Sequence, residues 1–353
     1  MSETVRYGII GTGMMGHEHI RNLALVEGAE VTAYADPSLE QRWWTAQLGL
    51  EGATAYEDHR ELLARAPIDA VVVASPNHTH RAVLEDVFAS DLHVLIEKPL
   101  CTTVEDARYV TERAESHAGV VWMGMEYRYM APLARLIEEV KGGTIGRLHM
   151  LAIREHRYPF LPKVGDWNRF SRNTGGTFVE KCCHFFDLMR LITDSEATRV
   201  YASAAQDVNH LDERYGGDTP DVLDNGFVTV DFENGVRALL DLCMFAEGSE
   251  NEQELAATGD AGKIECRIPE STLTIGRRNP RRIETAKVEV DPAVLSAGAH
   301  HGSTFVEHLG FRRAILDGTA PQVTAEDGLR AVMIGAAAEL SAAERRPVEL
   351  REL

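Results

Sequence analysis

The stretch YGIIGTGMMG, residues 7–16, decides the fold of this chain. Its first four residues form a short apolar run typical of a buried strand, and Gly11, Gly13 and Gly16 follow in the pattern G-x-G-x-x-G before a helical segment. In such a strand–turn–helix the first glycine permits the tight turn. The second removes a Cβ where a pyrophosphate approaches the backbone, and the third lets the helix pack closely on the strand. The helix N-terminus then offers unpaired N–H groups to phosphates.

The context of the glycines matters more than the glycines themselves, because chance alone gives roughly 0.2 such matches in a chain of this length and glycine content. A second strand-like run, Glu30–Ala35, ends at Asp36, twenty residues after Gly16. A carboxylate at that position accepts hydrogen bonds from the adenosine ribose and repels a 2′-phosphate. We therefore expect NAD, in preference to NADP, as the cofactor. The alternative is a glycine turn in an unrelated α/β protein.

Composition sets limits on partners and on location. The chain of 353 residues has a formal net charge of −19, which argues against nucleic acid or a membrane surface as partner, since both are polyanionic. The five cysteines are an odd number without zinc-site spacing, so we expect reduced thiols, no metal and a cytoplasmic protein. The N-terminus lacks a signal-peptide pattern, and no apolar run approaches the ~20 residues that a membrane span needs.

Strand-like and helical runs alternate up to residue 125, which predicts a doubly wound parallel sheet. Asp69–Ser75 is an uninterrupted apolar run, as expected of a parallel strand that is covered on both faces. Ligands of such sheets bind outside the carboxyl ends of the strands. The residues predicted to contact the cofactor there are Gly11, Gly13, Met14, Met15, Gly16, Asp36, Ser75, Pro76, Asn77, His80, Glu97 and Lys98.

The second part of the chain has a different pattern. Long strand-like runs follow one another without helices long enough for parallel crossovers, so an open, largely antiparallel sheet is expected in an α+β domain. We therefore predict two domains, 1–125 for cofactor binding and 126–353 for substrate binding and oligomerisation. The predicted strands are 147–157, 199–206, 225–233 and 236–245, and the predicted helices are 132–140, 177–192, 303–316 and 325–343.

At this point the chain resembles a known family. The GTGMMG loop, the EKP tripeptide Glu97–Pro99 and a Gly-Gly-led helix with His184 are similar to those of the Gfo/Idh/MocA oxidoreductases, over essentially the whole length. The resemblance implies a Rossmann domain followed by an open-sheet domain. It also implies an NAD(P)-dependent enzyme that oxidises or reduces a hydroxyl of a sugar, polyol or glycoside, and a homo-oligomer, commonly a dimer or tetramer.

Two residues match the catalytic pair of that family. Lys98 matches its catalytic lysine, and an ammonium at the end of a central strand can stabilise negative charge on the reacting oxygen. His184 matches the histidine that exchanges a proton with the substrate hydroxyl, a task suited to imidazole because its ordinary pKa lies near neutrality. On a helix Glu180 would share a face with His184, and Asp187 could orient the imidazole. The family commonly has aspartate where Glu180 stands and glycine where Cys182 stands, so the role of Glu180 stays open between substrate binding and histidine orientation.

Further candidates lie near these residues. Tyr127 and Arg128 follow the last predicted strand of the first domain, where the family often places substrate-facing residues; Tyr127 could contact substrate, act as a second acid or base, or simply pack between domains. The loop 156–172 is rich in aromatic and basic residues, which suits sugar stacking and anion binding. Its candidate substrate residues are Lys163, Trp167, Arg169 and Arg172, with an oligomer contact as the alternative. His300 and His301 precede a helix and are further, weaker candidates.

Three functions follow from these candidates. The leading hypothesis is an NAD-dependent dehydrogenase of a cyclic polyol, sugar or sugar derivative. The second is an NAD-dependent oxidoreductive glycosidase, which oxidises a ring hydroxyl transiently, eliminates the aglycone, adds water and reduces again, with Tyr127 or Glu180 as the extra base. Basic loop residues would allow an anionic sugar such as a sulfoquinovoside. The third is a non-catalytic NAD-bound regulator, which the intact Lys98 and His184 disfavour.

Overall fold

The computed structural model describes residues 4–296, 298 and 300–353. Contacts divide the chain into two compact units. The first comprises Met1–Tyr129, Lys163–Gly165 and Asp291–Arg330, and the second comprises Met130–Pro162, Asp166–Val290 and Ala331–Leu353. The first unit thus includes a late segment of the chain, 291–330, which sequence patterns alone place with the C-terminal half.

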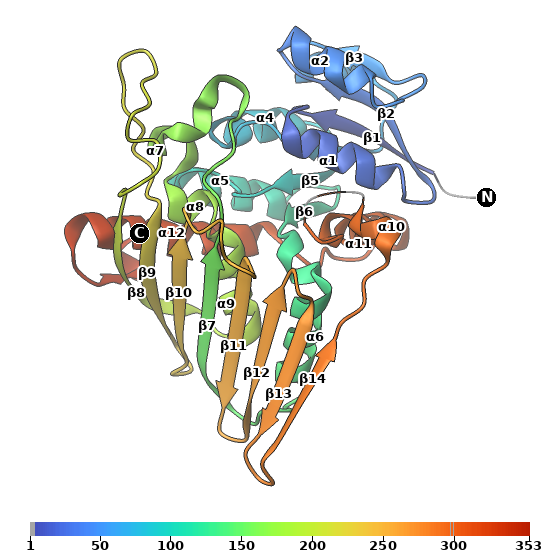
Figure 1. The fold of residues 1–353 in the computed structure, drawn as a ribbon. Coiled ribbons are helices and arrows are strands. Elements are labelled where there is room, and N and C mark those ends of the chain that lie inside the picture. The colour runs from blue at the N-terminus through green and yellow to red at the C-terminus, as the bar shows by residue number, and fades with distance from the viewer. Residues whose placement is uncertain (1–3, 297, 299) are drawn as a thin grey trace. The chain divides into compact units, whose positions relative to one another are not determined.

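The first unit is built on a six-stranded parallel sheet in the order β3-β2-β1-β4-β5-β6 (Figure 1). This confirms the predicted doubly wound sheet. The strand order reverses between β1 and β4, and in such sheets ligands bind beside that point, outside the carboxyl ends. The strands are β1 (Val5–Ile10), β2 (Ala29–Ala35), β3 (Thr54–Tyr56), β4 (Ala70–Val73), β5 (His93–Glu97) and β6 (Val121–Gly124).

Side-chain caps fix where several helices of this unit begin. Ser38, Asp58 and Thr103 each accept a hydrogen bond from a backbone N–H of the first turn. Residues 54–56 pair as a strand, so the third helix begins only after the cap at Asp58. The helices are α1 (Met14–Leu23), α2 (Leu39–Ala46), α3 (His59–Arg65), α4 (His80–Val87), α5 (Val104–Glu115), α10 (Pro292–Leu295) and α11 (Ser303–Asp317), with short 3-10 turns η1 (Asn77–Thr79) and η2 (Glu126–Tyr129).

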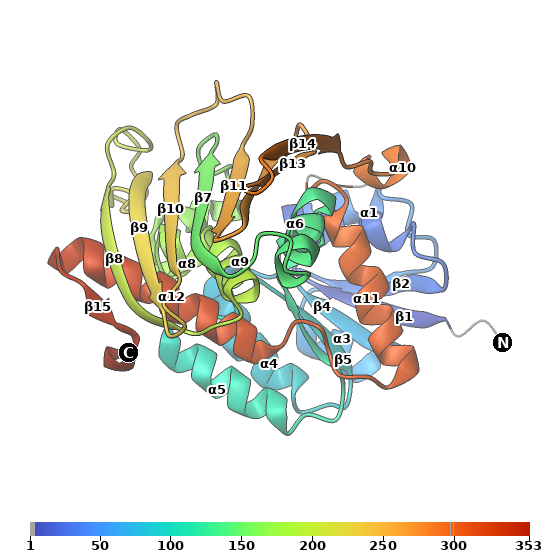
Figure 2. The same ribbon diagram turned by 90° about the horizontal axis from the view of Figure 1, so that it is seen from below.

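Helix α11 explains why the late segment belongs to the first unit. It packs against α1 and against η2, which follows β6 (Figure 2). Phe311, Glu307 and His308 on α11 are all fully buried. A helix from residues 303–317 therefore completes the core next to the carboxyl ends of β5 and β6.

The second unit is built on a nine-stranded sheet in the order β14-β13-β12-β11-β7-β10-β9-β8-β15. All pairs except β7–β10 are antiparallel, which confirms the expected open, mostly antiparallel sheet. The strands are β7 (Leu148–His156), β8 (Ala197–Ala205), β9 (Asn225–Phe232), β10 (Arg237–Cys243), β11 (Gln253–Gly259), β12 (Gly262–Ile268), β13 (Thr272–Arg277), β14 (Arg282–Lys287) and β15 (Val348–Glu349).

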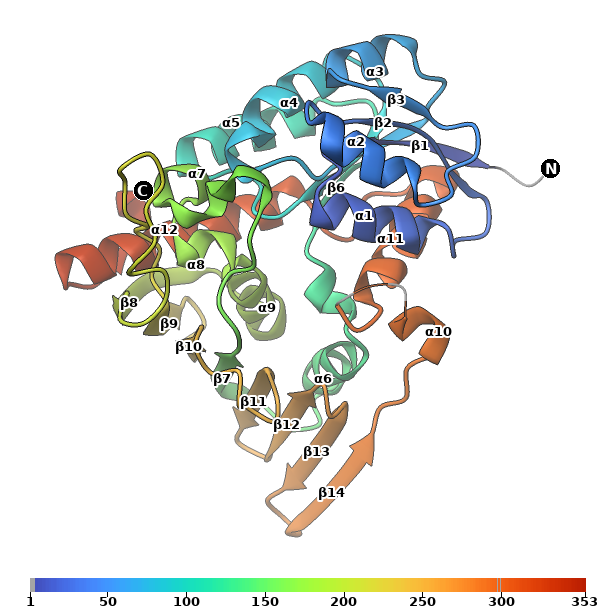
Figure 3. The same ribbon diagram turned by 45° about the horizontal axis from the view of Figure 1, so that its top comes forward.

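Helices cover one face of this sheet. Helix α6 (Ala131–Lys141) packs on β12 and β13, and α9 (Cys183–Thr193) packs on β7 and on α6 (Figure 3). Buried and exposed residues alternate along β9 and β10, so the opposite face carries the exposed side chains, Met150, Tyr201 and Phe227 among them. The remaining elements are α7 (Ser171–Thr174), α8 (Thr177–Glu180) and α12 (Ala325–Glu344), with turns η3 (Val164–Arg169) and η4 (Leu350–Glu352).

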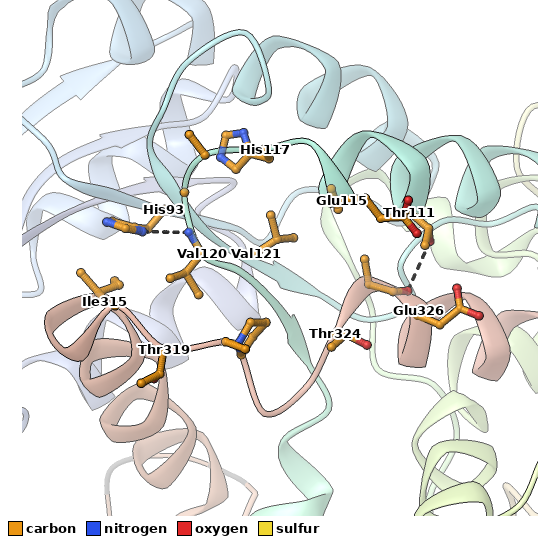
Figure 4. Close-up of a pocket in the computed structure, with 17 residues that line it drawn as sticks. His93, Thr111, Glu115, His117, Val120, Val121, Ile315, Thr319, Thr324 and Glu326 are labelled. Carbon is orange, nitrogen blue, oxygen red and sulfur yellow. Dashed lines mark hydrogen bonds between the residues drawn. The ribbon is translucent and has the colours of Figure 1, made fainter.

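A pocket of about 590 Å³ opens in the first unit (Figure 4). It is lined by the amino ends of β5 and β6, by the C-terminal part of α5 and by residues 318–326. His93 and Val121 begin β5 and β6, whereas Glu97 ends β5. The pocket therefore lies at the amino-terminal ends of the strands, and the predicted cofactor contacts lie at their carboxyl ends. None of the residues predicted to bind cofactor or substrate lines it.

Two further findings concern the described part of the chain. All five cysteines are free thiols, and four of them are buried. No helix among the described residues is both long enough and apolar enough to cross a bilayer.

Candidate active site

The glycine loop between β1 and α1 has a separate steric reason for each glycine. Gly11 has φ +88°, and a Cβ there would lie 2.5 Å from the backbone nitrogen of Ser75. A Cβ on Gly16 would lie 2.2 Å from the carbonyl oxygen of Gly11. A Cβ on Gly13 would meet no described atom within 4 Å. Gly11 and Gly16 are thus required by the fold itself, whereas Gly13 keeps open the space that a pyrophosphate would use.

Asp36 joins the end of β2 to this loop. Its Oδ2 accepts a hydrogen bond of 2.8 Å from the backbone N–H of Thr12, and its Oδ1 accepts one of 2.8 Å from the N–H of Ser38. The carboxylate therefore lies beside the glycine loop and holds it. Its predicted contact with the ribose hydroxyls remains a prediction.

The choice of cofactor tests Asp36. We expect wild type to prefer NAD over NADP by at least about 100-fold in kcat/KM, because a carboxylate repels the 2′-phosphate. Asp36→Asn keeps one acceptor oxygen but removes the charge, so its preference should fall at least about tenfold, mainly through better use of NADP. Steady-state kinetics with both cofactors measure this ratio. Equal use of NAD and NADP by wild type would contradict the role given to Asp36.

The loop after β4 contains two kinds of residue. His80 is fully buried, and its ring nitrogens lie 3.0 Å from the carbonyl oxygens of Ser75 and Pro99, so it links the loops that follow β4 and β5. Asn77 is also buried, yet within the described residues its Nδ2 has no hydrogen-bond partner, and neither has Oγ1 of Thr12. Buried polar groups are normally paired. Two such atoms, one in the glycine loop and one in the turn after β4, fit a polar cofactor.

Glu97 fixes the backbone that carries Lys98. It is the last residue of β5, where its Oε2 accepts from the Lys98 N–H at 3.0 Å and its Oε1 accepts from His19 Nε2 at 2.8 Å. Burial would raise the pKa of Glu97, but the hydrogen bond from His19 and the charges of His19 and Lys98 lower it to about 2. Nδ1 of His19 is in turn hydrogen-bonded to Nε2 of buried His308 on α11, at 2.9 Å. Lys98 therefore follows a residue whose two carboxylate oxygens are both hydrogen-bonded. The contacts of Lys98 itself with cofactor and substrate remain predictions.

Sequence reasoning missed a cluster of acidic residues beside this strand end. Glu18 of α1 accepts hydrogen bonds from His300 Nδ1 at 2.8 Å and from Thr304 at 3.1 Å. Glu126 follows β6, is buried, and has its Oε1 3.9 Å from the same His300 nitrogen. Glu307 of α11 is buried against Trp122. The sequence holds one signal for this cluster. Glu126 lies just after the last strand of the first unit and directly before the candidate Tyr127.

The helix that carries His184 differs from the predicted one. The predicted continuous helix 177–192 is wrong: it is two helices, α8 and α9, which are joined at Lys181 and Cys182. The Cys182 N–H reaches back to the carbonyl of Thr177 at 3.4 Å, and Cys183 Sγ lies 3.4 Å from the Glu180 carbonyl. The break lies between Glu180 and His184, so their shared helical face remains a prediction. Both side chains are buried, as is Asp187.

The structure explains why residue 176, directly before α8, is a glycine. Gly176 has φ +93°, and a Cβ there would lie 2.3 Å from the carboxyl carbon of Glu339 on α12. Glu339 accepts a hydrogen bond of 2.8 Å from the N–H of Phe178 in the first turn of α8. A carboxyl group at the amino end of α8 thus takes the place that a side chain on residue 176 would fill.

The ionisation of Glu339 makes stability depend on pH. Burial raises the pKa of Glu339 to about 7, although the hydrogen bond from Phe178 opposes it. The folded state therefore holds a proton that the unfolded state releases above its ordinary pKa of 4.5, so stability falls as the pH rises from about 4.5 to about 7. The loss is on the order of 3 kcal/mol. Glu339→Gln should be more stable than wild type at pH 8 and about equal at pH 5.

Thermal unfolding of both proteins at the two pH values measures this difference. Glu233→Gln, which changes an exposed carboxyl group of the same unit, serves as the control and should match wild type at both pH values. If the Glu339→Gln variant loses stability between pH 5 and pH 8 as much as wild type does, the ionisation of Glu339 is not responsible.

The residues predicted to bind substrate lie in different settings. Arg128 NH2 is 3.4 Å from Asp327 Oδ1, and its NH1 donates to the Gln322 carbonyl. Arg169 is buried, donating to Glu213 at 2.9 Å and to the Phe160 carbonyl at 3.2 Å. Both guanidinium groups thus link separate segments of the protein, and their contacts with substrate remain predictions.

The remaining substrate candidates differ in exposure. Arg172 is mostly exposed and pairs with Asp218 at 3.1 Å. Trp167 is half-buried in η3, where its carbonyl accepts from Asn173, and Lys163 is also half-buried. His301 is half-buried with φ +52° just before α11. Tyr127 is buried, with its ring 6.0 Å from that of His300. Substrate contacts of these residues remain predictions.

Comparison with known proteins decides the family. Residues 5–125 match the profile described as oxidoreductase family, NAD-binding Rossmann fold, and residues 137–350 match that family's C-terminal alpha/beta domain. The chain belongs to the Gfo/Idh/MocA oxidoreductase family. The resemblance in the GTGMMG loop and the EKP tripeptide is thereby confirmed, and so is the NAD cofactor expected from the glycine pattern.

Individual relatives of this Gfo/Idh/MocA protein are known. It is 29% identical to a myo-inositol 2-dehydrogenase of Thermotoga maritima, with 99% of each chain covered, and 34% identical to an inositol 2-dehydrogenase of Saccharopolyspora erythraea, with 77% and 75% covered. Among solved structures, a probable dehydrogenase of Thermotoga maritima matches with TM-score 0.81 and 28% identity over 99% of each chain. Levoglucosan dehydrogenase in complex with NADH and levoglucosan matches with TM-score 0.87 but 20% identity, covering 98% and 99%, which establishes a shared fold.

Proposed function

We propose that this oxidoreductase is an NAD-dependent dehydrogenase of a cyclic polyol or sugar, with an inositol-like ring as the leading substrate class. The observation that carries the proposal is Lys98, placed directly after β5 in an NAD-binding unit, where Glu97 fixes its backbone. The full-length similarity to a myo-inositol 2-dehydrogenase supports the substrate class. His184, a residue of the second unit, matches the other catalytic residue of the family.

The residues of the first unit would hold the cofactor. The loop Gly11–Gly16 offers backbone N–H groups at the start of α1, and the space at Gly13 admits the pyrophosphate. Thr12 and Asn77 offer buried polar atoms that bind no other described residue, and Asp36 would accept hydrogen bonds from the ribose hydroxyls. The bound nicotinamide supplies a hydride acceptor and donor at its ring.

The catalytic residues supply charge and proton transfer. The ammonium of Lys98 would hydrogen-bond the reacting oxygen and stabilise the negative charge that develops on it. The imidazole of His184 would accept the hydroxyl proton during oxidation and return it during reduction. Glu180, the buried last residue of α8, would hydrogen-bond a second substrate hydroxyl or orient His184.

We also propose that copies of this chain associate through the uncovered face of the nine-stranded sheet. That face exposes Tyr201 and Phe227 on the adjacent strands β8 and β9 and Met150 on β7, whereas helices cover the opposite face. Large exposed apolar side chains clustered on one face are typical of interaction surfaces. A cytoplasmic location remains part of this proposal.

The test is a substrate panel with two readouts. Purified protein is mixed with NAD and with inositols, aldoses and aryl glycosides, and NADH absorbance at 340 nm and aglycone release are followed in parallel. Stoichiometric NADH from a polyol or sugar is expected. Aglycone release without net NADH would replace the dehydrogenase by an oxidoreductive glycosidase. No turnover of any compound by protein that binds NAD would favour a regulator.

A further inference from the structure

In the cluster of carboxyl groups around the ends of β5 and β6, Glu18 and Glu126 approach the same imidazole, that of His300. Glu18 accepts hydrogen bonds from His300 and Thr304, and Glu97 accepts hydrogen bonds from His19 and from the Lys98 N–H. Such bonds hold both groups as carboxylates. Glu126 faces the same His300 nitrogen as Glu18, but at 3.9 Å against 2.8 Å. The imidazole therefore stands between two carboxyl groups and engages one of them closely.

The pKa values of these two groups move apart. Burial alone would raise the pKa of Glu18, but the bond and charge of His300 lower it. Burial raises the pKa of Glu126 to about 7, and the negative charge of Glu97 adds to the rise, although His300 and Lys98 oppose it. Two acidic groups whose surroundings separate their pKa values are the usual mark of assigned acid and base roles. Glu126 thus changes charge near neutral pH, while Glu18 stays ionised.

The position of Glu126 links this charge to Lys98. Glu126 lies in η2, directly after β6, and Lys98 follows the neighbouring strand β5, with Glu97 paired to Gly124 in the sheet. Because these strand ends are adjacent, the two side chains emerge from neighbouring positions of the sheet, and the positive charge of Lys98 lowers the pKa of Glu126. His300 is 23% exposed at its side chain, whereas Glu126 is 1% exposed, so the imidazole is the outer group of the pair.

We propose that Glu126 is a positioning residue of the active site that sets the charge around Lys98, and that it exchanges its proton with solvent through His300. At low pH Glu126 is neutral, and Lys98 faces the carboxylate of Glu97. Above neutral pH Glu126 becomes a second carboxylate that holds the Lys98 ammonium in place and keeps it charged. The inference rests on the proposed function of Lys98.

The other charged groups around Glu126 do not titrate in the same way. Glu307 of α11 is fully buried, and burial together with the charges of Glu126 and Glu97 raises its pKa far above the ordinary value, so it stays neutral. Burial lowers the pKa of His308, which stays neutral as well. The charged groups that act on Glu126 are Glu97, Lys98, His300 and Glu307. Behind them, Glu18 binds His300, and Arg128 acts on Glu307.

Glu307→Gln is therefore the matched control for Glu126→Gln. Both variants replace a buried glutamate of the same cluster by its neutral isostere, but only Glu126 carries a charge that pH changes. A third variant, Glu126→Asp, keeps the carboxyl group and guards against loss of folding in the glutamine variant. Circular dichroism and NAD binding verify that each variant is folded.

The first readout needs no substrate. Lys98 is half-buried, and its reactivity toward a limiting amine-acylating reagent is measured by mass spectrometry at pH 6 and pH 9. We expect Glu126→Gln to label Lys98 about tenfold faster than wild type at pH 9, because the ammonium has lost a carboxylate partner, and less than about twofold faster at pH 6. Glu307→Gln should match wild type at both pH values, and Glu126→Asp should retain the slow labelling at pH 9.

The second readout is the pH profile of kcat/KM with any substrate found in the panel. Wild type should show a bend near pH 7 that Glu126→Gln loses and Glu307→Gln keeps. Equal labelling and equal profiles in Glu126→Gln and wild type would overturn the proposal. If wild type turns over nothing, the proposed dehydrogenase fails, and the labelling of Lys98 alone still decides whether Glu126 controls its charge.

Discussion

Replacing Lys98 with alanine is expected to lower kcat by at least about 10³-fold while NAD affinity changes by less than about tenfold. The loss is expected because the substitution removes the ammonium group that, by the family pattern, hydrogen-bonds the reacting oxygen. Affinity should persist because the cofactor contacts rest on the loop Gly11–Gly16, on Asp36 and on Asn77, none of which the substitution touches. Steady-state kinetics and titration of NAD by fluorescence measure the two effects.

The control for this variant is Lys141→Ala, which removes an exposed lysine at the end of α6 and should behave as wild type. Wild-type turnover by Lys98→Ala would refute the mechanism. A large loss of NAD affinity would show that Lys98 acts chiefly in cofactor binding.

Alanine at Gly16 and alanine at Gly13 are expected to fail in different ways. Gly16→Ala places a Cβ 2.2 Å from the Gly11 carbonyl, which forces α1 away from the turn and should lower the melting temperature by several degrees or prevent folding. Gly13→Ala meets no protein atom within 4 Å, so folding should be unchanged. Its methyl group would occupy the pyrophosphate space, and NAD affinity should fall by at least about tenfold.

Thermal unfolding and NAD titration of the two variants separate these effects. Each variant is the control for the other, since the chemical change is the same and the two positions differ by three residues. Unchanged NAD affinity in a folded Gly13→Ala variant would show that the pyrophosphate does not approach the backbone there.

The sequence predicts those parts of the molecule that depend on local rules. The glycine loop is predictable because Gly11 needs a positive φ and Gly16 a close approach, and both needs show as residue identity. The apolar run 70–73 gives a buried parallel strand, and Thr103 caps a helix as its spacing to Asp106 indicates. The family motifs around Lys98 and His184 are equally local.

The parts that sequence patterns did not predict depend on distant partners. His19 and Glu97 are 78 positions apart, and Glu18 and His300 are 282 apart, so nothing local announces their hydrogen bonds. The break between α8 and α9 leaves no glycine or proline at Lys181 and Cys182 to mark it. The sequence patterns predict no strand in the region of β11–β14. Strand β14 is exposed along its whole length, so it lacks the alternation of buried and exposed residues that identifies a half-buried strand.

The most direct measurement of the central claim follows deuterium. An inositol or sugar that the protein oxidises is prepared with deuterium on the carbon that bears the reacting hydroxyl, and the NADH formed is examined by mass spectrometry. We expect one deuterium per NADH, on nicotinamide C4, because a dehydrogenase moves the hydride directly from that carbon. NADH without deuterium, or consumption of substrate with no NADH at all, would contradict the assignment as an NAD-dependent dehydrogenase.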